Sequence, residues 1–174
     1  YLPDESLILK DWLDKGYHAS MGYMNRNLEK RLNPVILTGW ARSVIMLRYN
    51  YSPLEERDPH FQYKFSKYAY GKDYHGVIKE KLKIIVDAVE EEIGEIAARV
   101  FVDSAPVLEK AWAAKCGLGW IGKNGNLINK NKGSFFFIAS LIVDIELEYD
   151  APIVKDFCGT CTRCIDNCPT EAIL

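Results

Sequence analysis

The chain has 174 residues, which is enough for one substantial core or for one domain with a small appendage. With 48% hydrophobic residues, 26% charged residues and a formal net charge of -2, the composition is that of an ordinary globular protein and excludes a strongly basic nucleic-acid binder at the level of the whole chain. No apolar run reaches the roughly 18 residues that a membrane helix needs, and the first residues show no signal peptide. We therefore expect no membrane association.

The first half of the chain predicts helices around one strand. An amphipathic pattern over residues 5–15 predicts a helix that ends at Gly16. A second helix is expected to end before Asn33-Pro34. The β-branched and aromatic residues of 43–51 predict a strand, and the charged, proline-containing residues 52–64 predict a loop.

The clearest helix is predicted for residues 74–98, with Asp73 as its N-cap. Apolar residues recur there at spacings of three and four and form a single stripe. The stripe consists of Leu82, Ile85, Val89, Ile93 and Ile96. We expect this stripe to face the core.

The second half of the chain predicts short strands and one more helix. Residues 100–102 read as a buried strand, followed by Asp103 and by a helix over 105–115. A glycine-rich loop, 117–124, lacks the spacing of a dinucleotide or Walker motif, and we interpret it as a tight loop that lets the backbone approach a planar cofactor. Strands are expected at 126–129 and 134–145, with a turn at 130–133.

These elements predict an α/β (α+β) domain over residues 1–154, followed by a small module over residues 155–174. That module contains four of the five cysteines, in the run Cys158-Gly-Thr-Cys161-Thr-Arg-Cys164-Ile-Asp-Asn-Cys168-Pro169. The spacing is that of two-cluster bacterial ferredoxins, in which the fourth cysteine binds the other [4Fe–4S] cluster. A zinc site is the alternative, but zinc ligands usually form two separated pairs.

Two consequences follow from this spacing. Cys158, Cys161 and Cys164 are expected to bind one cluster and Cys168 the second, so this chain holds an incomplete ligand set for both clusters. Clustered thiolates without an export signal also favour the reducing cytoplasm over a secreted disulfide framework.

Several segments, in this order, resemble the epoxyqueuosine reductase family. They are Phe65-Ser-Lys-Tyr-Ala-Tyr-Gly-Lys-Asp-Tyr-His75, Val102-Asp-Ser-Ala-Pro-Val-Leu-Glu-Lys110, Lys115-Cys-Gly-Leu-Gly-Trp-Ile-Gly-Lys-Asn124, Gly133-Ser-Phe-Phe-Phe137 and the cysteine run. The resemblance covers essentially the whole chain. Because members of the family extend further at both ends, we expect this chain to be truncated at both termini.

The resemblance implies a cobalamin-dependent reductase that converts epoxyqueuosine in tRNA to queuosine. It implies a cobalamin-binding domain of the reductive-dehalogenase type, two [4Fe–4S] clusters that pass electrons to the cobalamin, an external electron donor, a monomeric state and a cytoplasmic location. Two alternatives stay open. One is a ferredoxin-type electron-transfer protein, and the other is a cobalamin reductase of the same fold that acts on another substrate.

Asp103 and His75 are the predicted catalytic residues. Opening an epoxide leaves an alkoxide, and a carboxylic acid at the end of a buried strand can keep a raised pKa and donate the required proton. The resemblance implies this role for Asp103, whereas its place before a helix also fits an N-cap. His75 resembles an active-site residue, although a polar surface residue is the alternative. Ile78 stands where a cobalt-binding Asp-x-His-x-x-Gly motif has glycine, so His75 is not expected to bind cobalt.

The resemblance also implies cobalamin contacts by Arg31, Ser66, Leu127 and Ile138, alongside Asp103. Arg31 is expected to pair with a polar edge of the corrin. Leu127 and Ile138 would act through backbone or apolar contacts, and core packing is their alternative explanation.

Overall fold

The computed structural model describes residues 1–53, 60, 63, 65–153 and 155–173. Most of the loop expected at 52–64 lies outside the described residues. A three-stranded antiparallel sheet forms the centre of the fold, in the order β1 (Ser43–Asn50), β5 (Phe136–Val143), β2 (Ala98–Phe101). Register is set along β5, where Ser43 of β1 and Ala98 of β2 both pair with Val143. The mixed α/β class is thereby confirmed.

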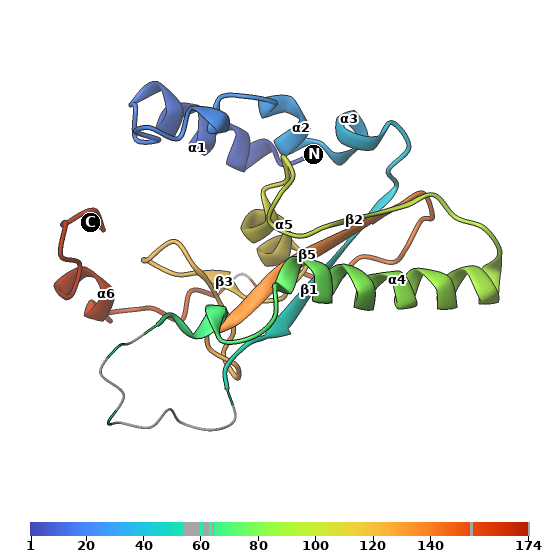
Figure 1. The fold of residues 1–174 in the computed structure, drawn as a ribbon. Helices are drawn as coiled ribbons and strands as arrows, with labels where there is room; N and C mark the ends of the chain where they lie inside the picture. Colours follow the sequence, from blue (N-terminus) through green and yellow to red (C-terminus); the bar gives the residue numbers. More distant parts are fainter. Residues whose placement is uncertain (54–59, 61–62, 64, 154, 174) are drawn as a thin grey trace.

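Helices cover both faces of this sheet (Figure 1). The N-terminal elements are α1 (Pro3–Asp14), the 3₁₀ turn η1 (Gly22–Met24), α2 (Leu28–Leu32) and α3 (Pro34–Thr38). They lie on one side together with α5 (Glu109–Lys115), and α4 (Tyr74–Ile93) lies on the other side. The remaining elements are η2 (Lys67–Ala69), a two-stranded sheet of β3 (Trp120–Ile121) and β4 (Leu127–Ile128), and α6 (Arg163–Asp166) in the cysteine segment.

The hydrophobic core has two halves, one on each face of the central strand β5. Its even-numbered residues Phe136 and Ile142 pack in a cluster with Trp112 of α5, whereas Ala139 packs with Ile78 and Leu82 of α4. Successive side chains of a strand point to opposite faces, so a strand covered on both faces reads as an almost continuous apolar run. Ser140 breaks this run, and its Oγ is buried without a hydrogen-bond partner among the described residues.

Two helix boundaries differ from the sequence-based prediction. The helix α4 ends at Ile93 rather than at residue 98, because Gly94 adopts a φ of 91° and ends the helical path. Ile96 therefore lies outside the helix. Ile85 and Ile93 are 42% and 58% exposed, and Leu82 is the one residue of the predicted stripe that is buried in the core.

The helix α5 begins at Glu109 rather than at residue 105. Pro106 disfavours a helical conformation for Ala105, and the preceding residues form turns instead. The glycine loop is tight, as expected, but it approaches the protein's own backbone: a Cβ at Gly119 would overlap the carbonyl of Ile128 in β4. Among the described residues no helix is long and apolar enough to span a bilayer.

Candidate active site

An open cavity of about 320 Å³ lies where α4, α5, β5 and the loop after β2 meet. Its lining is aromatic with a few polar groups, which is the usual make-up of a binding site. The lining residues are Tyr51, Tyr68, Tyr74, Asp103, Glu109, Lys110, Phe136, Phe137 and Ile138. The predicted catalytic residue Asp103 and the predicted cofactor contact Ile138 therefore reach the same cavity from distant parts of the sequence.

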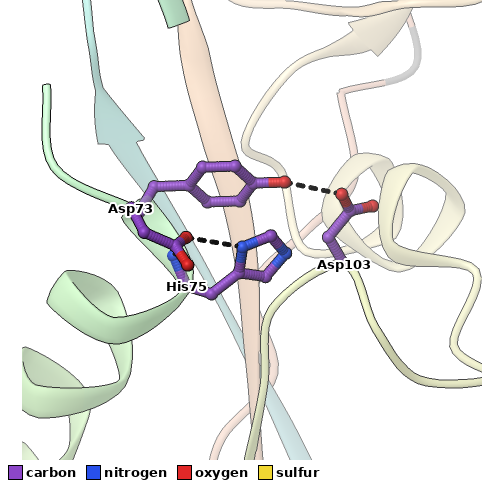
Figure 2. Close-up of polar contacts among 4 residues, drawn as sticks. Asp73, His75 and Asp103 are labelled. Atoms are coloured by element: carbon purple, nitrogen blue, oxygen red, sulfur yellow. Dashed lines mark hydrogen bonds and ion pairs between the residues drawn. The ribbon is translucent and has the colours of Figure 1, made fainter. Parts of the chain in front are cut away.

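Tyr74 connects the start of α4 to Asp103 (Figure 2). Its hydroxyl donates a 2.7 Å hydrogen bond to Asp103 Oδ2. The Tyr74 ring stacks on Phe137, with 3.9 Å between the centroids and 8° between the planes. Burial, followed by the hydrogen bond to Asp103, raises the pKa of Tyr74 strongly, so its hydroxyl remains a neutral donor at physiological pH.

His75 is oriented by Asp73, the residue before the helix. Asp73 Oδ1 accepts hydrogen bonds from the backbone N–H of His75 at 2.9 Å and lies 2.8 Å from its Nδ1. The predicted N-cap role of Asp73 is thus confirmed, and these two hydrogen bonds lower the pKa of its carboxyl. With Nδ1 held by Asp73, the imidazole lies between Asp73 and Asp103, stacked beside Tyr74 (Figure 2).

The environment of Asp103 differs from the one expected. Its side chain is exposed rather than buried, and α5 begins six residues later, so the alternative of a helix N-cap is wrong. Asp103 has a φ of 57°, in the left-handed region. The residues on either side of it are joined by a hydrogen bond of 2.7 Å from the Ser104 N–H to the Val102 carbonyl. This backbone shape follows from contacts with distant residues and not from a local helix start.

Glu109 is the titratable residue that the sequence analysis did not single out. The first residue of α5, it accepts a 2.8 Å hydrogen bond through Oε1 from the backbone N–H of Asp103. Burial raises the pKa of this carboxyl to about 7, and the neighbouring charge of Asp103 acts in the same direction. The only signal in the sequence was an acid shortly after Asp103 within the same motif.

The cysteine segment is held against the glycine loop by two side chains. Trp120 Nε1 donates to Cys158 Sγ at 3.5 Å. Lys123 Nζ donates to the carbonyls of Gly159 at 2.8 Å and Cys161 at 3.0 Å. These contacts place an N–H donor beside the Cys158 sulfur and the Lys123 ammonium beside the backbone of the cysteine run.

Cys168 has a separate set of donors. Hydrogen bonds from the Thr170 hydroxyl and then from backbone N–H groups, that of Thr170 first, lower the pKa of its thiol to about 7. Soft thiolates with N–H donors around them fit iron–sulfur ligation. Among the described residues no three His, Cys, Asp or Glu side chains come close enough to hold a metal ion, so the ligand assignment stays a prediction.

Comparisons with known proteins agree with this arrangement. A family model described as "Epoxyqueuosine reductase QueG, DUF1730" matches residues 31–104. The epoxyqueuosine reductase of Leadbetterella byssophila is 56% identical over 99% of this chain and 57% of its own length, and that of Cyclobacterium marinum is 55% identical over 100% and 56%. The chain is thus similar to epoxyqueuosine reductases over nearly its whole length. It spans about half the length of the curated relatives it matches.

Solved structures of this family share the fold. An epoxyqueuosine reductase bound to an epoxyqueuosine-modified tRNA-Tyr stem loop matches with a TM-score of 0.84 at 31% identity, over 97% of this chain and 46% of that one. The Bacillus subtilis enzyme, described with its catalytic aspartate loop swung out of the active site, matches with a TM-score of 0.80 at 31% identity, over 95% and 45%.

The other positions implied by the family resemblance, Arg31, Ser66 and Leu127, are not among the residues that line this cavity. Ser66 is exposed at the start of η2, two residues before the cavity-lining Tyr68. Leu127 is packed in the core, and the guanidinium of Arg31 donates to the Tyr23 carbonyl at 3.0 Å. The cobalamin contacts predicted for Arg31, Ser66 and Leu127 remain predictions, as does that of Ile138.

Proposed function

We propose that the gene product reduces epoxyqueuosine in tRNA to queuosine. The observation that carries this proposal is the hydrogen-bonded pair of Tyr74 and Asp103, beside His75, in an open aromatic cavity. The names of the relatives and the tRNA stem loop bound to one solved family member support the substrate. A bare electron carrier of the ferredoxin type has no use for such a group.

Reduction of an epoxide to an alkene consumes two electrons and two protons and releases water. We assign the first proton to the carboxyl of Asp103, which would protonate the oxygen when the epoxide carbon–oxygen bond opens. Tyr74 donates to Oδ2, so Oδ1 is left for the substrate. After the transfer, the Tyr74 hydroxyl stabilises the new carboxylate by a charge-assisted hydrogen bond.

His75 is the proposed source of the second proton. Asp73 holds its Nδ1, which leaves Nε2 to pass a proton to the substrate. The two acids would then act in sequence on the same oxygen, and the product oxygen would leave as water.

The electrons require cofactors beyond the protein's own groups. Bound cobalamin would supply a strongly reducing metal centre, with [4Fe–4S] clusters as its source of electrons. Ser66, Arg31, Leu127 and Ile138 are the proposed cobalamin contacts. The proposed cluster ligands are Cys158, Cys161 and Cys164 for one cluster and Cys168 for the other. The N–H donor from Trp120 to the Cys158 sulfur and the lowered pKa of the Cys168 thiol support this assignment.

The proposed partners follow from the reaction. They are a tRNA that carries epoxyqueuosine and an external electron donor, and we propose that the enzyme acts as a monomer. Because the substrate is tRNA and the ligands are reduced thiols, we propose a cytoplasmic location.

The test is reconstitution of the full-length gene product with iron, sulfide and cobalamin, followed by incubation with epoxyqueuosine-containing tRNA and a reductant. We expect queuosine among the nucleosides after digestion and mass spectrometry. Asp103→Asn should retain bound cobalamin but lose turnover. A protein with full cofactor content that forms no queuosine would show that the proposal is wrong, and an active Asp103→Asn variant would exclude the acid role.

A further inference from the structure

Asp103 has a backbone conformation that its own residue type does not favour. Its φ of 57° lies in the left-handed region, which L residues with a side chain seldom occupy. The Ser104-to-Val102 hydrogen bond closes a three-residue turn around it, a strained form of turn when φ is positive. Such a conformation persists only when other contacts hold it.

Two side chains hold Asp103, and they act on different atoms. Tyr74 of α4 binds the carboxylate, whereas Glu109 of α5 binds the backbone N–H through Oε1 at 2.8 Å. The contact with Tyr74 fixes the direction of the side chain. The contact with Glu109 fixes the peptide itself, and with it the position of the whole turn.

We propose that Glu109 is a positioning residue, which holds Asp103 in its cavity-lining conformation by accepting the hydrogen bond from the Asp103 amide. This inference rests on the proposed function, because it concerns the proton donor of that reaction. Glu109 acts through Asp103 and needs no contact with the substrate.

The surroundings of Glu109 keep its carboxyl available for this contact. Among the described residues it forms no ion pair. The Nζ of the adjacent Lys110 donates hydrogen bonds to the Gly125 carbonyl at 2.9 Å and to Asn126 Oδ1 at 3.3 Å. This ammonium therefore binds other acceptors than the Glu109 carboxyl. Among the described residues, the backbone amide of Asp103 is therefore the hydrogen-bond donor that the Glu109 side chain binds.

Three substitutions at this position separate the acceptor from the charge. Glu109→Ala removes both, Glu109→Asp keeps the charge but shortens the reach, and Glu109→Gln keeps a carbonyl oxygen of the same reach. Glu91→Ala, at an exposed position of α4, is the matched control. All are made in the full-length gene product loaded with iron–sulfur clusters and cobalamin.

We expect Glu109→Ala and Glu109→Asp to lower kcat by about 10- to 100-fold, the usual effect of losing one hydrogen bond to a charged group, while KM for the tRNA changes by less than about threefold. Glu109→Gln should retain kcat within about threefold of the wild type. Hydrogen exchange at the Asp103 amide should accelerate in the Ala and Asp variants and stay slow with Gln and in the control.

The amide exchange separates this inference from the proposed function, because it needs no turnover. Unchanged protection of the Asp103 amide in Glu109→Ala and Glu109→Asp, or unchanged kcat in both, would overturn the positioning role. If Glu109→Ala does not fold, Glu109→Asp decides alone. If the wild type forms no queuosine but the exchange pattern is as expected, the proposed reaction fails while the contact between Glu109 and Asp103 stands.

Discussion

Replacement of Glu109 by Gln should change how the stability of the protein depends on pH. Burial raises the pKa of Glu109 from 4.5 to about 7, so the folded chain binds more protons than the unfolded chain between these values. A raised carboxyl pKa means that ionisation destabilises the folded state. The free energy of unfolding should therefore fall as pH rises through this window, and the full penalty should be present above pH 7.

The size of the penalty follows from the shift. Each pKa unit corresponds to about 1.4 kcal/mol, so the rise in the pKa of Glu109 from 4.5 to about 7 corresponds to at most ~3.5 kcal/mol. Glu109 is only partly buried, and solvent screening lowers the expected value to about 1–3 kcal/mol. Glutamine does not titrate. The difference in unfolding free energy between Glu109→Gln and the wild type should thus rise by this amount from pH 4 to pH 8.

Urea unfolding followed by the fluorescence of the four tryptophans measures this difference at each pH. Asp103→Asn is the control, because the charge of Asp103 contributes to the raised pKa of Glu109 and its removal should shrink the pH dependence. Stability curves of the wild type and of Glu109→Gln that stay parallel from pH 4 to pH 8 would refute the reasoning.

Three further predictions concern other parts of the molecule. Tyr74→Phe keeps the stack on Phe137 but removes the donor to Asp103, so kcat for queuosine formation should fall about tenfold; unchanged turnover would exclude a role for the hydroxyl. Ser140→Ala removes a buried hydroxyl without a partner among the described residues and should raise the unfolding free energy by up to ~1 kcal/mol in urea titrations, whereas a clear loss would contradict this. Anaerobic iron and sulfide analysis of residues 1–174 should give clearly less than one full cluster per chain, and a stable stoichiometric [4Fe–4S] centre would disprove the divided ligand set.

Local patterns predicted most of the secondary structure. The strands β1 and β5 and the helices α1 and α4 lie where β-branched runs and helical spacings placed them. The largest boundary errors fall at the end of α4 and at the start of α5, and the short helix α3 was not predicted. Gly94 stops a helix whose apolar spacing continues to Ile96, and Pro106 delays a helix that was expected to include it.

The sequence by itself indicated the family resemblance and predicted iron–sulfur ligands in the run from Cys158 to Cys168, because the spacing of cysteines is a local property of the chain. It also indicated Asp103 and His75 as residues of interest. Only the tertiary structure decided how they are used. Tyr74 and Asp103 are 29 residues apart, and their hydrogen bond exists because α4 and the loop after β2 pack around the same central strand. The same packing leaves Asp103 exposed, raises the pKa of the Glu109 carboxyl by burial and links the two residues through the backbone amide of Asp103. No pattern within a single element encodes these contacts, because burial and neighbouring charge are properties of the assembled core.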